Sequence, residues 1–129
     1  MKRIAAATLL LIMSLTGCSG YNEHYSATVL ISSEGNNKAY QRFEKFNGTR
    51  VLDLRNSDHD KDTLYYTVTL GEGSVTVYVD YDGEKRDLFT IEGGEEVEDS
   101  ISGIDFHKVY VIIESDGTCE DGNFEFEIA

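Results

Sequence analysis

Tyrosine and carboxylate side chains alternate with apolar residues in two neighbouring segments, 63–70 and 75–81, and this pattern could bind a sugar. Strict alternation predicts two strands, each with an apolar and a polar face. Paired as a hairpin, the segments place Tyr65 diagonally across from Tyr78 on the polar face, with Asp80 two residues further along. Flat rings can stack on a sugar ring while hydroxyl and carboxylate groups hydrogen-bond to its hydroxyls. Tyr65, Tyr78 and Asp80 are therefore the candidate ligand-binding residues, with an ordinary solvated sheet face as the alternative.

Acidic residues crowd three stretches of the chain, which raises the question of a calcium site. The stretches contain Asp58, Asp60 and Asp62, then Asp80, Asp82 and Glu84, and finally Glu114, Asp116, Glu120 and Asp121. An EF-hand loop starting at Asp58 would need glycine and glutamate where this chain has Thr63 and Thr69. A chain with 24 acidic residues also contains such clusters by composition alone. We therefore predict no metal site, with calcium in the third stretch as the alternative.

The sequence lacks the motifs of known catalytic sites. His24, His59 and His107 are far apart, and each lies among polar or charged neighbours. The chain has no His-Glu-x-x-His metal motif, no Gly-x-Ser-x-Gly nucleophile turn, no Cys-x-x-Cys pair and no glycine-rich phosphate loop. We therefore predict that the protein is not an enzyme and has no cofactor.

The first 18 residues form a targeting segment rather than part of the fold. Met1-Lys2-Arg3 is basic, and residues 4–15 form an apolar run that is short of the ~20 residues needed to span a bilayer. The run ends in Leu15-Thr16-Gly17-Cys18, which resembles the lipobox of bacterial lipoproteins. The resemblance implies that residues 1–17 are a cleaved signal helix and that Cys18 carries lipid such as palmitate. It also implies an exported protein anchored to the bacterial cell membrane or cell surface, whereas an ordinary secretory signal would leave Cys18 free.

Loss of the signal peptide would leave a strongly acidic chain. The formal net charge of −13 would become −15, because Lys2 and Arg3 leave with the signal peptide. Nucleic-acid binding needs a basic surface, so nucleic acid is excluded as a partner, and flat contact with anionic lipid is disfavoured. Residues 18–25 are expected to form a lipidated tether, and residues 26–129 a single domain of ordinary size.

Short runs rich in Val, Ile, Tyr, Phe and Thr follow the signal, separated by turn residues. The chain has no proline, so its turns depend on Gly, Asn and Asp. The expected turns are Gly35-Asn36-Asn37, Phe46-Asn47-Gly48, Asp82-Gly83, Gly93-Gly94, Asp116-Gly117 and Asp121-Gly122-Asn123. No segment after residue 20 sustains a helical period, and residues 38–45 are expected to be a strand. The pattern predicts an all-β fold, an antiparallel β-sandwich of about seven or eight strands with jelly-roll or Ig-like topology.

Two hairpin registers follow from placing the apolar residues on one side of each pair. The first pairs Leu70 with Val75, Val68 with Val77 and Tyr66 with Val79. The second pairs Val109, Val111 and Ile113 with Ile128, Phe126 and Phe124, and leaves a long connection, 114–123. The expected core contains Val68, Val77, Val79, Val111, Phe124 and Phe126. Cys119 would be the lone thiol of a lipidated chain, and we expect it to be buried.

These features favour a surface-anchored lipoprotein with a small, non-catalytic binding or adhesion domain, whose ligand is a glycan, a protein or a cation. The main alternative is an accessory structural subunit of an envelope complex, and an enzyme is a remote third. Glycan binding through the hairpin requires Tyr65 and Tyr78 to be exposed and coplanar. The accessory role requires an exposed apolar patch, expected around Leu30, Ile112 or Leu88.

Overall fold

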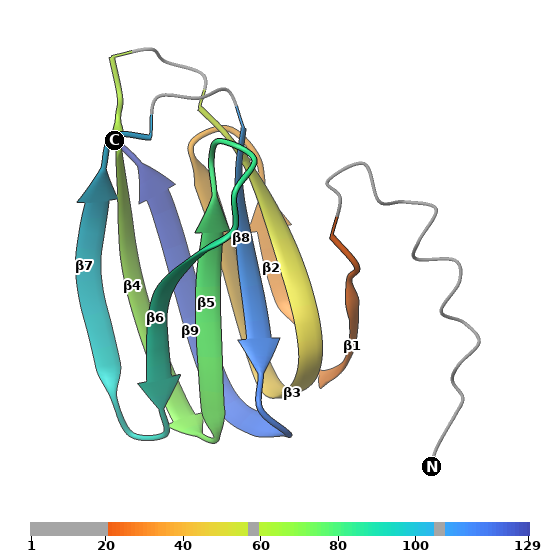
Figure 1. Cartoon of the computed structure of the whole chain (residues 1–129). Helices are drawn as coiled ribbons and strands as arrows, with labels where there is room; N and C mark the ends of the chain where they lie inside the picture. Colours follow the sequence, from red (N-terminus) through yellow and green to blue (C-terminus); the bar gives the residue numbers. More distant parts are fainter. Residues whose placement is uncertain (1–20, 57–59, 105–107) are drawn as a thin grey trace.

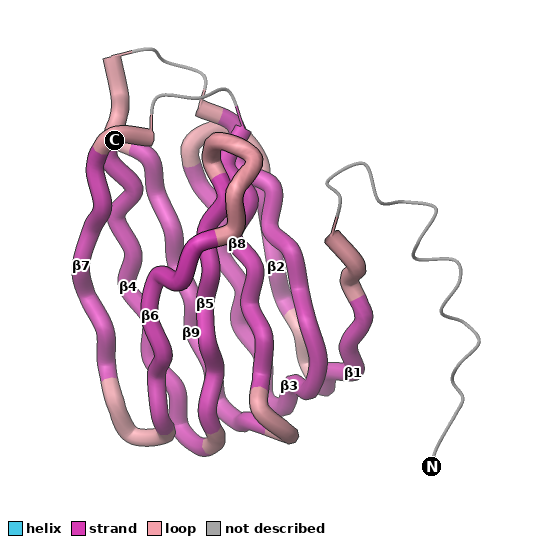
Figure 2. The backbone as a smooth tube through the Cα atoms, viewed as in Figure 1, coloured by secondary structure: helices cyan, strands magenta, loops and turns pink. Residues whose placement is uncertain are grey.

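The computed structural model describes residues 21–56, 60–104 and 108–129, so the signal peptide and Cys18 lie outside the described residues. The strands are β1 (His24–Thr28), β2 (Ile31–Glu34), β3 (Lys38–Arg55), β4 (Thr63–Glu72), β5 (Ser74–Asp80), β6 (Arg86–Glu92), β7 (Glu96–Ser102), β8 (Lys108–Ser115) and β9 (Cys119–Ile128). The connections between them are mostly short (Figure 2). Within the described ranges, no helix has the length and apolar character to cross a membrane.

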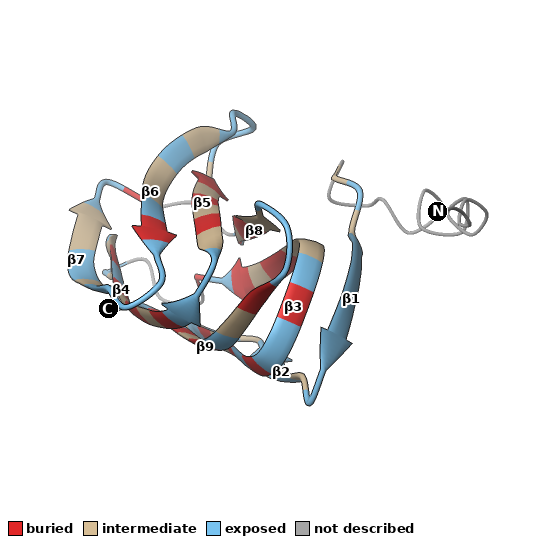
Figure 3. Ribbon diagram, turned by 90° about the horizontal axis from the view of Figure 1, so that it is seen from below, coloured by how far each residue is buried: buried red, intermediate tan, exposed pale blue. Residues whose placement is uncertain are grey.

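The strands form one antiparallel sheet that folds over into two layers (Figure 1). Its order is β6-β5-β8-β3-β9-β4-β7, and β1 and β2 also pair with β3. Viewed from the end, β6, β5 and β8 form one layer, and β7, β4 and β9 form the other (Figure 3). The long strand β3 belongs to both layers, because residues 38–46 pair with β9 and residues 49–55 pair with β8. This arrangement confirms the predicted antiparallel β-sandwich.

The pairing of strands from β3 to β8 is nested. β5 pairs with β6, β4 with β7 and β3 with β8, as in one long hairpin. Rolling up this hairpin brings β5 beside β8, and β9 fills the place between β3 and β4. Nested pairing of this kind is jelly-roll topology, the first of the two predicted alternatives.

Apolar residues at alternate positions fill the space between the layers. From residue 64 to 70 in β4 and from 75 to 79 in β5, every second residue is no more than 5% exposed: Leu64, Tyr66, Val68, Leu70, Val75, Val77 and Val79. All six residues of the predicted core are buried, and Phe124 and Phe126 of β9 are among the largest of them. Burying each such side chain stabilises the fold by about 1.5–3 kcal/mol.

The predicted hairpin between residues 63–70 and 75–81 is wrong. β4 pairs with β7 and β9, and β5 pairs with β6 and β8, so the two strands lie in different layers. Their apolar faces meet across the core instead of side by side. The alternation of apolar residues along β4 and β5 is consistent with both arrangements, because each arrangement buries the same set of side chains.

The predicted hairpin between residues 109–113 and 124–128 is also wrong. β8 and β9 follow one another along the same edge of β3, from the pair Arg55–Lys108 to the pair Lys38–Glu127. The connection between them is only residues 116–118, because Cys119 already begins β9. The expected turn at Asp121-Gly122-Asn123 therefore lies inside β9.

The corner between the layers lies at Gly48 of β3, where the sequence predicted a turn that ends a strand. Gly48 has φ = 132° and contacts β1 so closely that a Cβ atom there would lie 2.3 Å from the His24 carbonyl oxygen. The Ser115 hydroxyl accepts a hydrogen bond from the Gly48 amide at 2.8 Å and donates one to its carbonyl at 3.3 Å. Ser115 thereby provides hydrogen-bond partners for the amide and carbonyl of Gly48, at the point where the strand paired with β3 changes from β9 to β8. Strand β3 therefore continues through the corner without a break.

The N-terminal residues 21–23 pack on the domain before β1 begins. Tyr21 donates a hydrogen bond to Asp80, and its ring meets the Tyr110 ring edge-on with centroids 6.1 Å apart. The Glu23 carboxylate accepts hydrogen bonds from Arg50 and from the Val51 amide, both at 2.8 Å. Residues 21–25 of the expected tether therefore contact the domain in the structure.

Candidate functional site

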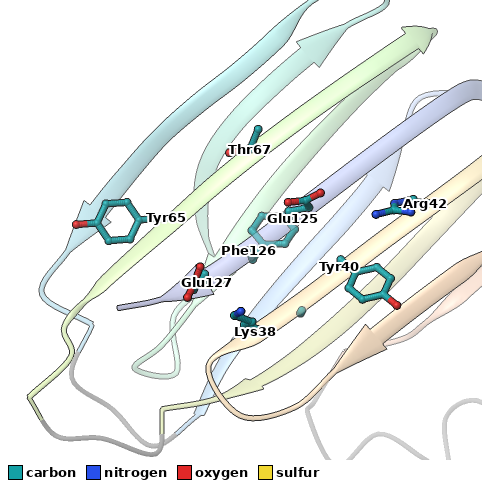
Figure 4. Close-up of a pocket in the computed structure, with 9 residues that line it drawn as sticks. Lys38, Tyr40, Arg42, Tyr65, Thr67, Glu125, Phe126 and Glu127 are labelled. Atoms are coloured by element: carbon teal, nitrogen blue, oxygen red, sulfur yellow. The ribbon is translucent and has the colours of Figure 1, made fainter.

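An open groove of about 400 Å³ lies on the outer face of β3, β9 and β4 (Figure 4). The residues that line it are Lys38, Ala39, Tyr40, Arg42, Tyr65, Thr67, Glu125, Phe126 and Glu127. Because side chains alternate along a strand, the polar members point outward while Ala39 and Phe126 point into the core. The groove is therefore lined mainly by the outward-pointing side chains of three adjacent strands.

Strand register arranges the outward residues in two rows. One row runs from Lys38 through Glu127 to Tyr65. The next row runs from Tyr40 through Glu125 to Thr67. Neighbours in a row are about 5 Å apart, which is close enough for one bound molecule to contact several of them. Two aromatic rings thus flank a central pair of carboxylates, as Figure 4 shows.

The two tyrosines of the groove differ in their surroundings. Tyr65 is 51% exposed, the most exposed aromatic residue in the part of the chain that the structure describes. Tyr40 is half-buried, and the Arg42 guanidinium carbon lies 5.6 Å from the centre of its ring. Arg42 is itself held by a 3.3 Å hydrogen bond from Nε to Asn123 Oδ1. Tyr40 and Arg42 therefore pack against each other, whereas the Tyr65 ring is exposed to solvent.

Glu125 and Glu127 present carboxylate oxygens along the middle of the groove. Both residues are exposed. Among the described residues, no salt bridge within 4.0 Å involves either carboxylate. An ionised carboxylate has about four acceptor sites, so the pair can take several hydrogen bonds from a ligand rich in hydroxyl groups.

Tyr78 lies in the other layer and does not join this groove. The Lys85 ammonium group is 4.2 Å from the centre of the Tyr78 ring and 3.0 Å from Glu114 Oε2. Burial, together with the nearby Glu114 carboxylate, raises the pKa of Tyr78. Lys85 therefore covers one face of the Tyr78 ring, which the sequence analysis had predicted to stack on a sugar.

Asp80 holds the turn between β5 and β6. It is 6% exposed, and its Oδ1 atom accepts hydrogen bonds from the amides of Gly83 at 2.7 Å and Asp82 at 3.2 Å. Its other carboxylate oxygen accepts the Tyr21 phenol. The structure thus separates Tyr78 and Asp80 from Tyr65, so the three do not form a common site.

The sequence analysis missed the groove residues of β3 and β9. The signal was present: Lys38, Tyr40 and Arg42 alternate with buried residues, and Glu125 and Glu127 alternate with Phe124 and Phe126. Each segment was expected to be a strand, but the wrong partner strands were assigned to them. Only the correct pairing of β9 between β3 and β4 brings these side chains together with Tyr65.

The acidic stretches do not form a cluster of metal ligands in the described part of the chain. Within residues 21–56, 60–104 and 108–129, no three His, Cys, Asp or Glu side chains lie close enough together to hold a metal ion.

Cys119 is buried as expected, and its thiol lies 3.2 Å from the Phe46 carbonyl oxygen. Burial raises the pKa of the Cys119 thiol to about 11. This thiol is therefore a core residue rather than a reactive group.

Of the positions where an accessory subunit was expected to expose an apolar patch, the region around Leu30 does expose apolar side chains, because Val29 is 58% and Ile31 51% exposed. Ile112 is completely buried, and Leu30 and Leu88 are partly buried against the core. Ile112 faces away from the main core, where Val51 and Tyr78 are its neighbours on the adjacent strands. On the outer face of β8, Ile112 is therefore covered by side chains of the neighbouring strands β3 and β5.

No protein-family model and no curated protein matches the sequence. Among solved structures, the pre-peptidase C-terminal domain of a collagenase from Bacillus anthracis is similar, with 13% identity and a TM-score of 0.47 over 77% of this chain and 97% of that chain. CBM29-2, a family 29 carbohydrate-binding module complexed with mannohexaose, has 16% identity and a TM-score of 0.42 over 84% and 78% of the two chains. A cupin-2 domain protein from Shewanella frigidimarina has 15% identity and a TM-score of 0.36 over 90% and 92%. Likeness this distant does not identify a ligand, so the function has to be argued from the side chains of this chain.

Proposed function

We propose that the protein is an exported lipoprotein whose acidic jelly-roll domain is a non-catalytic, glycan-binding module. The observation that carries this proposal is the groove on the outer face of β3, β9 and β4, with the exposed Tyr65 ring directly opposite Glu127. Lipid on Cys18 would anchor the module to the cell membrane.

The chemistry of the groove suits a sugar. One face of a pyranose ring is apolar and can stack on Tyr65, which removes apolar surface from water. The hydroxyl groups around that ring need hydrogen-bond acceptors, and Glu125, Glu127 and Thr67 provide them within one strand spacing of Tyr65. A site that combines a few polar groups with aromatic surface in a shallow groove is typical of ligand binding.

The geometry supports binding rather than hydrolysis. Glycosidases place two carboxyl groups on either side of the bond that is cleaved. Glu125 and Glu127 project from one strand on the same side, so they contact a ligand from the same direction. In the part of the chain that the structure describes, no strand or loop lies over the outer face of β9 and β4 (Figure 3).

Affinity electrophoresis tests glycan binding. The domain, residues 21–129, is run through gels containing β-1,4-linked polymers of glucose, mannose, galactose or N-acetylglucosamine. We expect retardation in at least one gel and its loss in Tyr65→Ala. Tyr25→Ala is the matched control, because Tyr25 is also partly exposed, at 37%, but lies on β1 outside the groove. Equal retardation of both variants would contradict the assigned site, and no retardation in any gel would contradict glycan binding.

Membrane anchoring is tested separately on the full chain in a bacterial host. Mass spectrometry of the wild-type protein should find its first residue to be Cys18 bearing acyl chains, and Cys18→Ala should give an uncleaved or soluble protein. Stable anchoring needs two or more acyl chains, which the mass would also reveal. Wild-type protein with an unmodified Cys18 would refute the anchor and leave the glycan-binding proposal untouched.

A further inference from the structure

Tyr40 and Tyr65 lie at opposite sides of the groove, with β9 between them (Figure 4). Their strands are two spacings of about 4.8 Å apart, and their rows differ by a two-residue step of about 7 Å, so their Cα atoms are roughly 12 Å apart. This separation exceeds the width of one sugar ring. A ligand that contacts both tyrosines therefore has to be an oligomer lying obliquely across the strands.

The groove is open along this oblique direction. In the end view, no segment of the described chain covers the outer face of β9 and β4 (Figure 3). The lining residues come from three strands and from no loop, so nothing in the groove could enclose the end of a chain. A polymer can therefore enter and leave this face while extending beyond it on both sides.

The charges on this face select against an acidic ligand. Glu98 of β7 lies opposite Thr67 on the side away from Glu125, and Glu96 follows it one row further along. The two cations of the groove, Lys38 and Arg42, both lie on β3, and Arg42 is held by Asn123 and Tyr40. Four glutamates thus face two cations, in a chain with a formal net charge of −13. The field of such a surface repels polyanions.

From these observations we infer that the ligand is a linear, non-acidic glycan, bound through an internal stretch of at least three sugar units that reaches from Tyr40 to Tyr65. This inference rests on the proposed glycan-binding function and specifies its ligand. Tyr65 stacks on one unit, Glu125 and Glu127 accept hydrogen bonds from the units in the middle, and Tyr40 supports the far end. Lys38 lies opposite Glu127 in the β3–β9 register.

A chain-length series tests the inference. Calorimetric titration of the domain uses soluble β-1,4-linked oligomers of glucose, mannose, galactose and N-acetylglucosamine, from one to six units. For the sugar that binds, we expect affinity to rise at least about tenfold between the disaccharide and the tetrasaccharide and then to level off. Tyr40→Ala should remove this gain, and Tyr40→Phe should retain it.

The outcomes separate the two proposals. Equal affinity for the monosaccharide and the tetrasaccharide would overturn the oligomer inference, although glycan binding would stand. Binding of none of the oligomers or polymers would overturn glycan binding itself, and the inference with it. Polygalacturonate provides the charge test: retention as strong as that of the neutral polymer at low salt would show that the ligand is acidic, contrary to the inference.

Discussion

The ring of Phe43 lies directly over Gly122, its partner across the β3–β9 ladder. A Cβ atom on Gly122 would be 2.3 Å from Cζ of Phe43. Both residues are buried, and Phe43 also stacks on Phe46 with ring centroids 5.1 Å apart. The space that a side chain at 122 would need is therefore filled by an aromatic cluster that belongs to the core.

Gly122→Ala should accordingly destabilise the domain. The added methyl group displaces the Phe43 ring, and overpacking of this kind costs about 1–3 kcal/mol. Gly35→Ala is the control, because a Cβ there has no atom within 4 Å. Urea unfolding followed by circular dichroism gives both free energies. Equal stability of the two variants would mean that Phe43 moves aside without cost.

Phe126 and Glu127 are neighbours on β9 that face opposite sides. Phe126 is 2% exposed, whereas Glu127 is exposed in the groove. Phe126→Ala should cost about 3–5 kcal/mol, and Glu127→Ala should leave the free energy of unfolding within about 0.5 kcal/mol of wild type. Urea unfolding measures both. Small effects from both variants would refute the assignment of inner and outer faces.

Tyr21 gives the domain a dependence on alkaline pH. Burial and then the hydrogen bond to Asp80 raise the pKa of Tyr21 from 10.0 to about 12. Because folding favours the protonated phenol, its contribution to stability is complete below pH 10 and is lost as the pH rises from 10 to 12. Tyr21→Phe should lower stability at pH 8 by about 1 kcal/mol, and the difference from wild type should shrink across that range. Tyr25→Phe serves as control, and a difference that stays constant would show that the phenol proton is not involved.

Charge repulsion should be measurable in this acidic chain. Five side-chain ion pairs are present among the described residues, far fewer than the 24 acidic residues of the sequence. Repulsion among the others reaches over a Debye length of about 30 Å at 0.01 M salt and is screened at 0.5 M. The melting temperature should therefore rise with sodium chloride between these concentrations. An unchanged or falling value would show that pairing already compensates the charges.

The Cys119 thiol should be inert in the folded domain. It has no exposed surface, and its pKa is raised to about 11, so the reactive thiolate is scarce at pH 8. A thiol reagent such as Ellman's reagent should react with residues 21–129 only at the rate of unfolding, and fully in urea. Fast reaction without denaturant would show that the corner around Phe46 opens readily.

Local alternation predicted strands at β4, β5, β8, β9 and the first part of β3, and it identified the buried faces of β4, β5, β8 and β9. Val68, Val77, Phe124 and the other core residues could be named because a strand in a sandwich exposes every second side chain. The same pattern could not determine which strand pairs with which. Burial of Leu70 and Val75 is satisfied by pairing side by side or by packing face to face, and only long-range geometry distinguishes the two.

The groove depends on those strand partners, and of the three predicted ligand-binding residues only Tyr65 lines it. Tyr78 has the same alternation, yet Lys85 from the following turn covers its ring, and this contact has no local sequence signal. Gly48 illustrates the same limit. Asn47-Gly48 is a typical turn sequence, but β1 and Ser115 keep β3 continuous through the corner.

If Cys18 carries lipid as proposed, the attachment of Tyr21 to Asp80 and Tyr110 would orient the domain relative to the membrane. Those two residues belong to the outer face of β5 and β8, while the groove is on the outer face of β3, β9 and β4. With lipid on Cys18, three residues of extended chain allow the domain a clearance of about 10 Å, little more than the distance over which an anionic bilayer repels it. The bilayer would then face the Tyr21 side. The groove would point outward, where it meets polymers of the envelope or of the surroundings rather than lipid headgroups.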